Sequence, residues 1–356
     1  MYKASELELA KMLSLVVERN ASDLHLKVGE PPIIRVDSKL VRLDTYQVLS
    51  QESITDIANL MMNETQKNLF HSQQDLDVSY TFKDNVRFRV NIYTQQGVTG
   101  IALRTIPNHI KTLEELGLPQ ILRTFTEKKQ GLVLFTGPVG QGKSTAMASL
   151  VNEINHKRAD HILTIEDPIE FVLTPAASVI TQREVSVDTP SFAQAMKSAL
   201  REDINCLLVG EMRDLESISS ALTLAETGHL IFATLHTNDA AQTVDRIIDV
   251  FPAVQQGQVR AQLASVLLGI VSLRLLPKIG GGRVPAYEIL MANHAVRNVI
   301  RDNKTFEINN IIHTNLESGM VPMDKVLALL VKQGVVELEV AQGHVQDNDY
   351  FLSLIR

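Results

Sequence analysis

The sequence predicts an α/β protein in which a doubly wound, mainly parallel sheet follows a smaller α+β domain. Three observations lead to this fold class. Short apolar runs alternate with helical patterns from Gly131 onward, and before residue 107 the hydrophobic period is largely that of strands. A glycine-rich turn also joins the first of the alternating strands to a helix. Such alternation is typical of a doubly wound sheet with helices on both faces.

The N-terminal part is predicted to be a compact unit of strands covered by helices. The strand-like patterns lie at 22–28, 33–36, 40–43, 76–82, 86–93 and 97–106. Helical patterns at 6–17 and 53–70 are expected to cover one face of this sheet. The predicted domains are therefore an α+β domain at 1–106, a linker at 107–119 and an α/β domain at 120–356.

The C-terminal part supplies the alternating pattern. Its β-rich runs lie at 132–135, 161–165, 178–183, 205–209 and 230–235. Later the pattern becomes mainly helical, with helices expected at 240–250, 255–273, 294–301, 304–312, 323–332 and 337–344 and one strand at 283–290. The expected sheet delivers the carboxyl ends of its strands to one crevice, where ligands bind in such folds.

Composition narrows the class of protein. The chain has 356 residues, which is the length of about two domains, and its net charge of −7 disfavours nucleic acid as the main partner. Its single cysteine, Cys206, lies in an apolar run and excludes an internal disulfide or a multi-cysteine zinc site. The N-terminus has no apolar signal segment, and Ser265, Ser272 and Arg274 interrupt the longest apolar stretch. We therefore expect neither secretion nor a transmembrane segment.

The glycine-rich turn predicts a triphosphate site. Residues 137–144 read GPVGQGKS, a complete G-x-x-x-x-G-K-[ST] loop between a strand and a helix. Its glycines let several N–H groups point at one centre, which suits phosphate oxygens at a helix N-terminus. Lys143 would bind the β/γ-phosphates and Ser144 would bind Mg²⁺. The nucleotide-binding residues are expected to be Gly137, Pro138, Val139, Gly140, Gln141, Gly142, Lys143, Ser144 and Thr145.

Acidic and histidine-bearing segments follow the other strands. Residues 165–170 carry three carboxylates, Glu211 follows the next apolar run, and His229 and His236 bracket a third. Since parallel strands end at the same crevice, we expect these groups to converge on the phosphate loop, where phosphoryl transfer needs them for Mg²⁺ and water. Taken singly, each has a plainer explanation: a turn cap, an ion pair of Glu211 with Arg213, or a hydrogen-bonded histidine.

Four segments carry a specific resemblance. GPVGQGKS, TIEDPIE, LLVGEMRD and TGHLIFATLHTNDA resemble the Walker A, Asp-box, Walker B and His-box motifs of the type II secretion/type IV pilus ATPase family. Residues 21–26 and 31–35 resemble the PAS-like N-terminal domain of that family. The similarity runs from about Ala4 to Leu330. It implies a PAS-like α+β domain followed by a RecA-like ATPase domain that uses ATP and Mg²⁺.

Within the family, the sequence is most similar to pilus retraction ATPases. Residues 281–284 and 295–301 resemble their GGGRV strand and AIRNLIRE motif. The resemblance implies a homohexamer that hydrolyses ATP to withdraw pilin, the basis of twitching motility. It further implies a cytoplasmic protein held at the inner face of the membrane by an inner-membrane pilus platform protein, with a paralogous pilus ATPase as a further partner. Departures at Tyr287 and 204–206 leave open whether it is a principal or an accessory retraction ATPase.

The resemblance also implies catalytic roles in the C-terminal domain. Glu170 matches the residue assigned to activating water, and Glu211 matches the Walker B acid. Because Gly210 stands where a generic Walker B segment has aspartate, Glu211 is expected to act on Mg²⁺ through bound water. His229 and His236 match residues that sense the nucleotide or the neighbouring subunit.

Arginines of the N-terminal domain complete the implied site. Arg89 and Arg104 match residues that supply guanidinium groups to the triphosphate. Without the resemblance, the plainer explanation is that these arginines lie on a solvent-exposed face of a strand. A second expectation concerns 295–301, where Arg297 and Arg301 should share an exposed helix face that a partner reads.

Two other functions remain open. One is a ring ATPase of the same superfamily that moves DNA or a secretion substrate, which basic loops would favour and the net acidity disfavours. The other is a nucleotide-binding scaffold without hydrolysis, which would predict loss of Glu170 or Glu211. Both glutamates are present.

Overall fold

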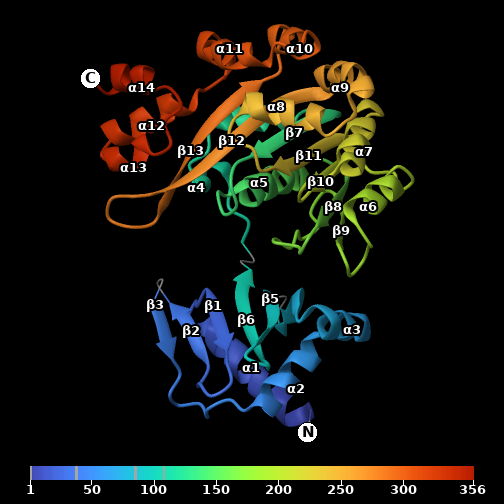
Figure 1. Cartoon of the computed structure of the whole chain (residues 1–356), viewed down its shortest axis with the longest axis vertical. Helices are drawn as coiled ribbons and strands as arrows, with labels where there is room; N and C mark the ends of the chain where they lie inside the picture. Colours follow the sequence, from blue (N-terminus) through green and yellow to red (C-terminus); the bar gives the residue numbers. More distant parts are fainter. Residues whose placement is uncertain (1, 37–38, 84–85, 107–108) are drawn as a thin grey trace. The chain divides into compact units, whose positions relative to one another are not determined.

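The computed structural model describes residues 2–36, 39–83, 86–106 and 109–356. They group into two compact units, drawn in Figure 1: Met1–His109 with Pro168–Val172, and Ile110–Asp167 with Leu173–Arg356. Residues 110–119, expected to belong to a linker, thus group with the second unit, and Leu113 and Leu118 are buried there. Pro107 and Asn108, the first two residues of the expected linker, lie outside the described residues.

The first unit contains a six-stranded antiparallel sheet in the order β3-β2-β1-β6-β5-β4. Its elements are α1 (Tyr2–Glu18), β1 (Asp23–Leu26), β2 (Ile33–Val36), β3 (Lys39–Arg42), α2 (Gln51–Met61), α3 (Glu64–Gln73), β4 (Asp75–Phe82), β5 (Val86–Gln95) and β6 (Val98–Ile106). Alternate strand residues such as Phe88 and Val90 form one buried cluster with Leu13 of α1 and Ile57 of α2. One face of the sheet is therefore covered by helices, and the other carries its polar side chains.

The helix expected at 53–70 is two helices. Met62 adopts an extended backbone conformation, and Asn63 caps α3 by accepting a hydrogen bond from the N–H of Gln66 at 2.9 Å. The Gln66 side chain in turn accepts from the N–H of Asn63 at 2.9 Å. This reciprocal capping box satisfies N–H groups at the start of α3 and allows the chain to change direction.

The second unit contains a seven-stranded sheet in the order β13-β12-β7-β11-β10-β8-β9. Its strands are β7 (Gly131–Thr136), β8 (His161–Glu166), β9 (Val179–Glu184), β10 (Cys206–Val209), β11 (Leu230–Leu235), β12 (Leu267–Pro277) and β13 (Arg283–Met291). Neighbouring strands are parallel except β12 and β13, which pair antiparallel. The predicted mainly parallel sheet is thus confirmed.

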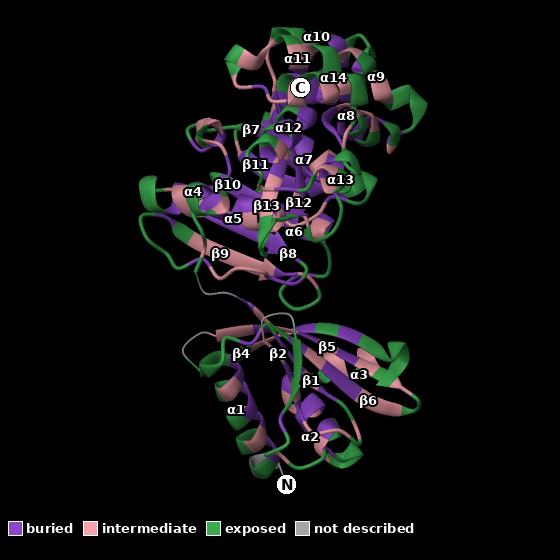
Figure 2. Cartoon of the chain, turned by 90° about the vertical axis from the view of Figure 1, so that its left-hand side faces the viewer, coloured by how far each residue is buried: buried purple, intermediate pink, exposed green. Residues whose placement is uncertain are grey.

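Helices cover both faces of this sheet. They are α4 (Leu113–Leu116), η2 (Gln120–Phe125), α5 (Lys143–Lys157), α6 (Phe192–Ala199), α7 (Leu215–Glu226), α8 (Ala240–Asp249), α9 (Ala253–Val266), α10 (His294–Arg301), η3 (Thr305–Glu307), α11 (Ile308–Thr314), η4 (Leu316–Ser318), α12 (Met323–Lys332), α13 (Leu338–Gln342) and α14 (Asn348–Ile355). Leu132 and Leu134 of β7 pack with α6 to α10, whereas Val133 and Phe135 pack with α5. The central strands β7, β10 and β11 are therefore buried on both sides (Figure 2, buried residues in purple), and the doubly wound class is confirmed. None of the described helices is long and apolar enough to span a bilayer.

The helix expected at 255–273 is wrong in its second half. α9 ends at Val266, and the chain continues directly as β12, which pairs with β7 and β13. Residues 267–273 are almost entirely apolar, so their pattern does not distinguish a buried strand from a buried helix. Gly269 permits the tight packing, because a Cβ there would lie 2.5 Å from the Phe125 ring.

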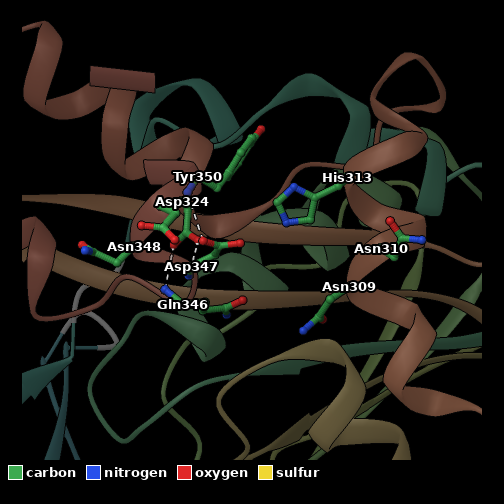
Figure 3. A pocket seen from close by; sticks show the side chains of 9 residues that line it. Asn309, Asn310, His313, Asp324, Gln346, Asp347, Asn348 and Tyr350 are labelled. Atoms are coloured by element: carbon green, nitrogen blue, oxygen red, sulfur yellow. Dashed lines mark hydrogen bonds between the residues drawn. The ribbon is translucent and has the colours of Figure 1, made fainter. Parts of the chain in front are cut away.

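A buried carboxylate of α12 holds the C-terminal segment of the second unit in place. Asp324 of α12 is only 2% exposed and accepts hydrogen bonds from the N–H groups of Gln346 and Asp347 at 2.8 and 2.7 Å, as Figure 3 shows. Phe351 of α14 is fully buried beside α12. A polar pocket of about 640 Å³ lies here, and Tyr350 packs edge-on against His313 in its wall. No residue of the phosphate-loop, Asp-box, Walker B or His-box segments lines this pocket.

Candidate functional site

The phosphate loop connects β7 to α5. Gly137, Gly140 and Gly142 have φ of +136°, +78° and +84°, a region that side chains disfavour. At Gly137 a Cβ would also lie 2.5 Å from the carbonyl oxygen of Leu273. Gly142 precedes Lys143, the first residue of α5, and no side chain caps this helix start. The open helix N-terminus is suited to an anion, as predicted.

The Lys143 ammonium lies inside this loop. Lys143 is only 7% exposed. Its Nζ donates hydrogen bonds to the carbonyl oxygens of Gly137 at 2.5 Å and Pro138 at 2.9 Å. It also lies 3.4 Å from Nδ1 of His236. The protein thus holds a positive charge within the loop that the sequence assigned to phosphate.

Glu211 and His236 meet at the carboxyl ends of β10 and β11. The His236 Nε2 lies 3.0 Å from the carboxylate of Glu211, and Arg213 lies 2.7 Å from its other oxygen. The Lys143 ammonium can only donate, so its contact with Nδ1 is a hydrogen bond in the tautomer of His236 that carries its proton on Nε2, toward Glu211. One histidine therefore links the phosphate-loop lysine to the Walker B carboxylate.

Charge keeps the Glu211 carboxylate ionised. Burial raises its pKa, but the hydrogen bonds from Arg213 and His236 and the charge of Arg213 outweigh this, so the pKa lies below its ordinary value. The ion pair with Arg213 that the sequence allowed is therefore present beside the contact with His236. An ionised carboxylate is the form that binds Mg²⁺ or its waters.

Close packing against β8 explains why a glycine precedes Glu211. Gly210 lies against β8, where a Cβ would come within 3.3 Å of the Ile165 carbonyl oxygen and the Glu166 Cα. Its N–H donates to Ile165 at 2.8 Å. An aspartate at this position would press on the backbone of the neighbouring strand.

The Asp-box segment begins at the carboxyl end of β8. Glu166 is buried and accepts a hydrogen bond from the Thr164 hydroxyl at 2.8 Å. Glu170 follows in Pro168–Val172, the segment that groups with the first compact unit, and its side chain is half-buried. Its role as the activator of water stays a prediction.

His229 lies apart from the other motif residues of the second unit. It precedes Leu230 at the amino end of β11, whereas His236 follows the carboxyl end. Six strand residues separate them, which corresponds to roughly 20 Å. Nδ1 of His229 contacts the carbonyl oxygen of Leu224 at 2.9 Å. A single chain therefore does not bring both histidines to the phosphate loop, and a role for His229 toward a neighbouring subunit stays a prediction.

Arg89 and Arg104 are cross-strand neighbours on β5 and β6. Arg89 pairs with Asp77 at 3.2 Å, and Arg104 Nε donates to Asp23 at 2.9 Å. Burial raises the pKa of Asp23, but hydrogen bonds from Ser22 and Arg104 and the nearby charges outweigh it and hold the pKa below the ordinary value. The Arg104 side chain remains 73% exposed, so the sheet presents two guanidinium groups side by side.

Two charged residues near the phosphate loop lie outside the four motif segments. Arg274 of β12 donates to Asn238, two residues after His236, and Glu288 of β13 accepts from the N–H of Ala240. Both side chains are buried. The sequence signal for such a residue is a charge within an otherwise apolar run, and by that pattern alone Arg274 only interrupts the run.

The expected exposure of Arg297 is wrong, and a partner role for this helix stays a prediction. Its guanidinium donates to the carbonyl oxygens of Ala264 at 2.6 Å, Ser265 at 2.5 Å and Leu267 at 3.0 Å, at the end of α9. It thus satisfies carbonyls that a helix C-terminus leaves open. Burial lowers the pKa of Arg297, with a further contribution from Arg301. Only Arg301 is an exposed arginine of this helix.

We expect Arg297→Ala to destabilise the protein by about 1–3 kcal/mol, because several partly buried carbonyls lose their donor. Arg301→Ala is the matched control and should change stability by less than about 0.5 kcal/mol. Denaturant unfolding of both variants measures the difference. Equal stability of the two variants would contradict the capping role.

Comparisons with family models, with known proteins and with solved structures agree on one family. The model of the family described as "Type II/IV secretion system protein" matches residues 4–281. The chain is 43% identical to the type IV pilus retraction ATPase PilT of Pseudomonas aeruginosa, over 94% of this chain and 97% of that protein. It is 37% identical to the type IV pilus ATPase PilU of the same species, over 98% and 91%. A crystal structure of the pilus retraction motor PilT with bound ADP is 43% identical, with a TM-score of 0.89 over 96% of this chain and 98% of that one.

Proposed function

Because the chain belongs to the type II/IV secretion system protein family, we propose that it is an ATPase motor that powers retraction of type IV pili. The link from Lys143 through His236 to Glu211 is the observation that carries the proposal. In this link a buried ammonium, a histidine and an ionised carboxylate follow one another in direct contact. The resemblance to a retraction ATPase over nearly the whole chain names the work that hydrolysis would drive.

The residues of the second unit divide the chemistry. N–H groups of residues 137–145 and the Lys143 ammonium would hold the phosphates of ATP. The Ser144 hydroxyl and the Glu211 carboxylate would supply oxygen ligands of the kind that Mg²⁺ takes, since Mg²⁺ keeps several waters and needs few protein ligands. When bound, Mg²⁺ neutralises charge on the β- and γ-phosphates. Glu170 would accept the proton of the attacking water.

The molecule would work as a homohexamer at the cytoplasmic face of the membrane. Arg89 and Arg104 would reach the triphosphate when units or subunits close on it, since guanidinium forks match phosphate oxygens. An inner-membrane pilus platform protein would receive the motion, and a paralogous pilus ATPase would be a further partner. With a net charge of −7 we expect no nucleic-acid partner, and the accessory retraction ATPase is the second candidate function because PilU is also similar.

The proposal predicts that hydrolysis requires assembly. ATP turnover per chain should fall as the protein is diluted to a monomeric concentration, measured by sedimentation in parallel. Arg104→Ala should reduce turnover by roughly tenfold or more, because a guanidinium that stabilises transferring phosphate is worth at least that much. The effect on stability should stay within about 1 kcal/mol, since the side chain is mostly exposed.

Arg42→Ala provides the control, because Arg42 is an exposed arginine of the same sheet paired with Glu30. Its turnover should match the wild type. Constant turnover down to the monomer would refute the requirement for a ring. In cells, loss of the protein should stop twitching motility, whereas turnover stimulated by DNA would favour a DNA-moving ATPase.

A further inference from the structure

β12 forms a wall beside the phosphate loop and contacts it at two points. The carbonyl oxygen of Leu273 lies so close to Gly137 that a Cβ there would be 2.5 Å away. Two residues on, the N–H of Leu275 donates to Oε1 of Gln141 at 2.6 Å. The backbone of 273–275 therefore supports the loop that would receive phosphate at its first residue and at Gln141.

Arg274 lies between these two contacts and reaches the segment that follows β11. One guanidinium nitrogen donates to the Leu273 carbonyl at 2.9 Å, and the other donates to the backbone and side-chain oxygens of Asn238 at 3.1 and 3.0 Å. The residue is 9% exposed. One side chain thus binds the carbonyl that abuts Gly137 and clamps Asn238 with two hydrogen bonds.

The segment held in this way carries His236. Asn238 is two residues after His236, which contacts Lys143 and Glu211 at 3.4 and 3.0 Å. A second anchor holds the segment two residues later, where the carboxylate of Glu288 accepts from the N–H of Ala240 at 2.8 Å. The position of His236 is therefore set from two neighbouring strands, β12 and β13.

Burying the Arg274 guanidinium removes it from water, and its hydrogen bonds offset this loss of solvation. Burial lowers the pKa of Arg274, and the carboxylates of Glu288 and Asp239 oppose that shift. Its hydrogen-bond acceptors among the described residues are the neutral oxygens of Leu273 and Asn238 rather than a carboxylate. The contacts therefore depend on the directions of the N–H groups rather than on pairing with an opposite charge. A guanidinium is suited to this because it is planar and its N–H directions are fixed.

We propose that Arg274 is a positioning residue that couples the phosphate loop to His236 through Asn238. This inference rests on the proposed ATPase function and adds a residue to its machinery. Arg274 acts through Asn238, and its loss would let His236 and the carboxylate it contacts drift from the nucleotide. Because a displacement of about 1 Å can cost on the order of 10²-fold in rate, the effect should appear in kcat rather than in binding.

Steady-state kinetics of Arg274→Gln should show kcat reduced roughly 10- to 100-fold, with the Kd for ATP changed less than about threefold. Arg274→Lys should recover part of kcat, since an ammonium can reach one Asn238 oxygen. Asn238→Ala is a second test that avoids disturbing the core, because it removes only the side-chain acceptor of an exposed residue. Combined with Arg274→Gln, it should add little further loss. Arg283→Gln, at an exposed position of β13, is the control.

Unchanged kcat per folded molecule, or fully additive losses at 274 and 238, would overturn the inference. Hydrogen exchange gives a test that does not need turnover. ADP should protect both 137–145 and 237–241 in the wild type but only 137–145 in Arg274→Gln; protection of both segments in that variant would also overturn it. A wild type that exchanges as expected but does not hydrolyse ATP would refute the proposed function alone.

Discussion

Replacing Lys143 with alanine is expected to abolish ATP turnover and to weaken nucleotide binding about tenfold or more. The ammonium is held inside the phosphate loop by two carbonyl oxygens, within 3.4 Å of His236. Hydrogen bonds from a charged donor are worth about 1.5–3 kcal/mol, which corresponds to roughly 10- to 100-fold in affinity. Alanine supplies neither the charge nor the donors. Calorimetric titration with ADP and ATP, together with a phosphate-release assay, measures both effects.

Lys129→Ala is the matched control, because Lys129 is an exposed lysine before β7. It should bind and hydrolyse as the wild type does. The unfolding midpoint of Lys143→Ala must also be recorded, since the substitution leaves the carbonyls of Gly137 and Pro138 without this donor. If a folded Lys143→Ala protein bound ATP with wild-type affinity, the loop would not be the triphosphate site.

Glu170→Gln is expected to lower turnover by ~10²-fold or more while leaving ATP binding largely intact. The amide keeps the size of the side chain but does not accept the proton of the attacking water, and general base catalysis contributes at least about this factor. The variant should therefore accumulate bound ATP rather than ADP. Single-turnover hydrolysis and nucleotide extraction from the complex distinguish slow chemistry from weak binding.

A surface carboxylate provides the comparison for this variant. Glu216 is exposed at the start of α7 and pairs with Lys197, so Glu216→Gln should hydrolyse ATP at the wild-type rate. Turnover of Glu170→Gln close to the wild type would remove Glu170 from the role of base. Glu211 would then be the next carboxylate to test, since it lies in contact with His236.

Local patterns accounted for much of the fold. Strands 33–36 and helices 294–301 and 323–332 were predicted with the observed boundaries, because each has a clear period and a clear start. The glycine-rich loop was likewise predictable, since its three positive φ values need glycine whatever surrounds them. The order of the strands in the sheet was not predicted, because pairing joins residues far apart in the chain.

The errors also have a common cause. The apolar run at 267–273 was assigned to a helix because a buried strand has no alternation to display. Arg297 was assigned to the surface, although it caps a helix more than thirty residues earlier in the chain. His229 and His236 share a motif but lie at opposite ends of β11. Each outcome depends on what a residue meets in space.

The phosphate loop, the α/β sheet behind it and the acidic groups after the following strands could be predicted from the sequence, because these features depend on residues close together in the chain. The link from Lys143 through His236 to Glu211 and the hydrogen bonds from Arg274 to Asn238 are visible only in the folded chain. Those contacts join strands distant in sequence, and their hydrogen bonds need positions that only the packed sheet supplies.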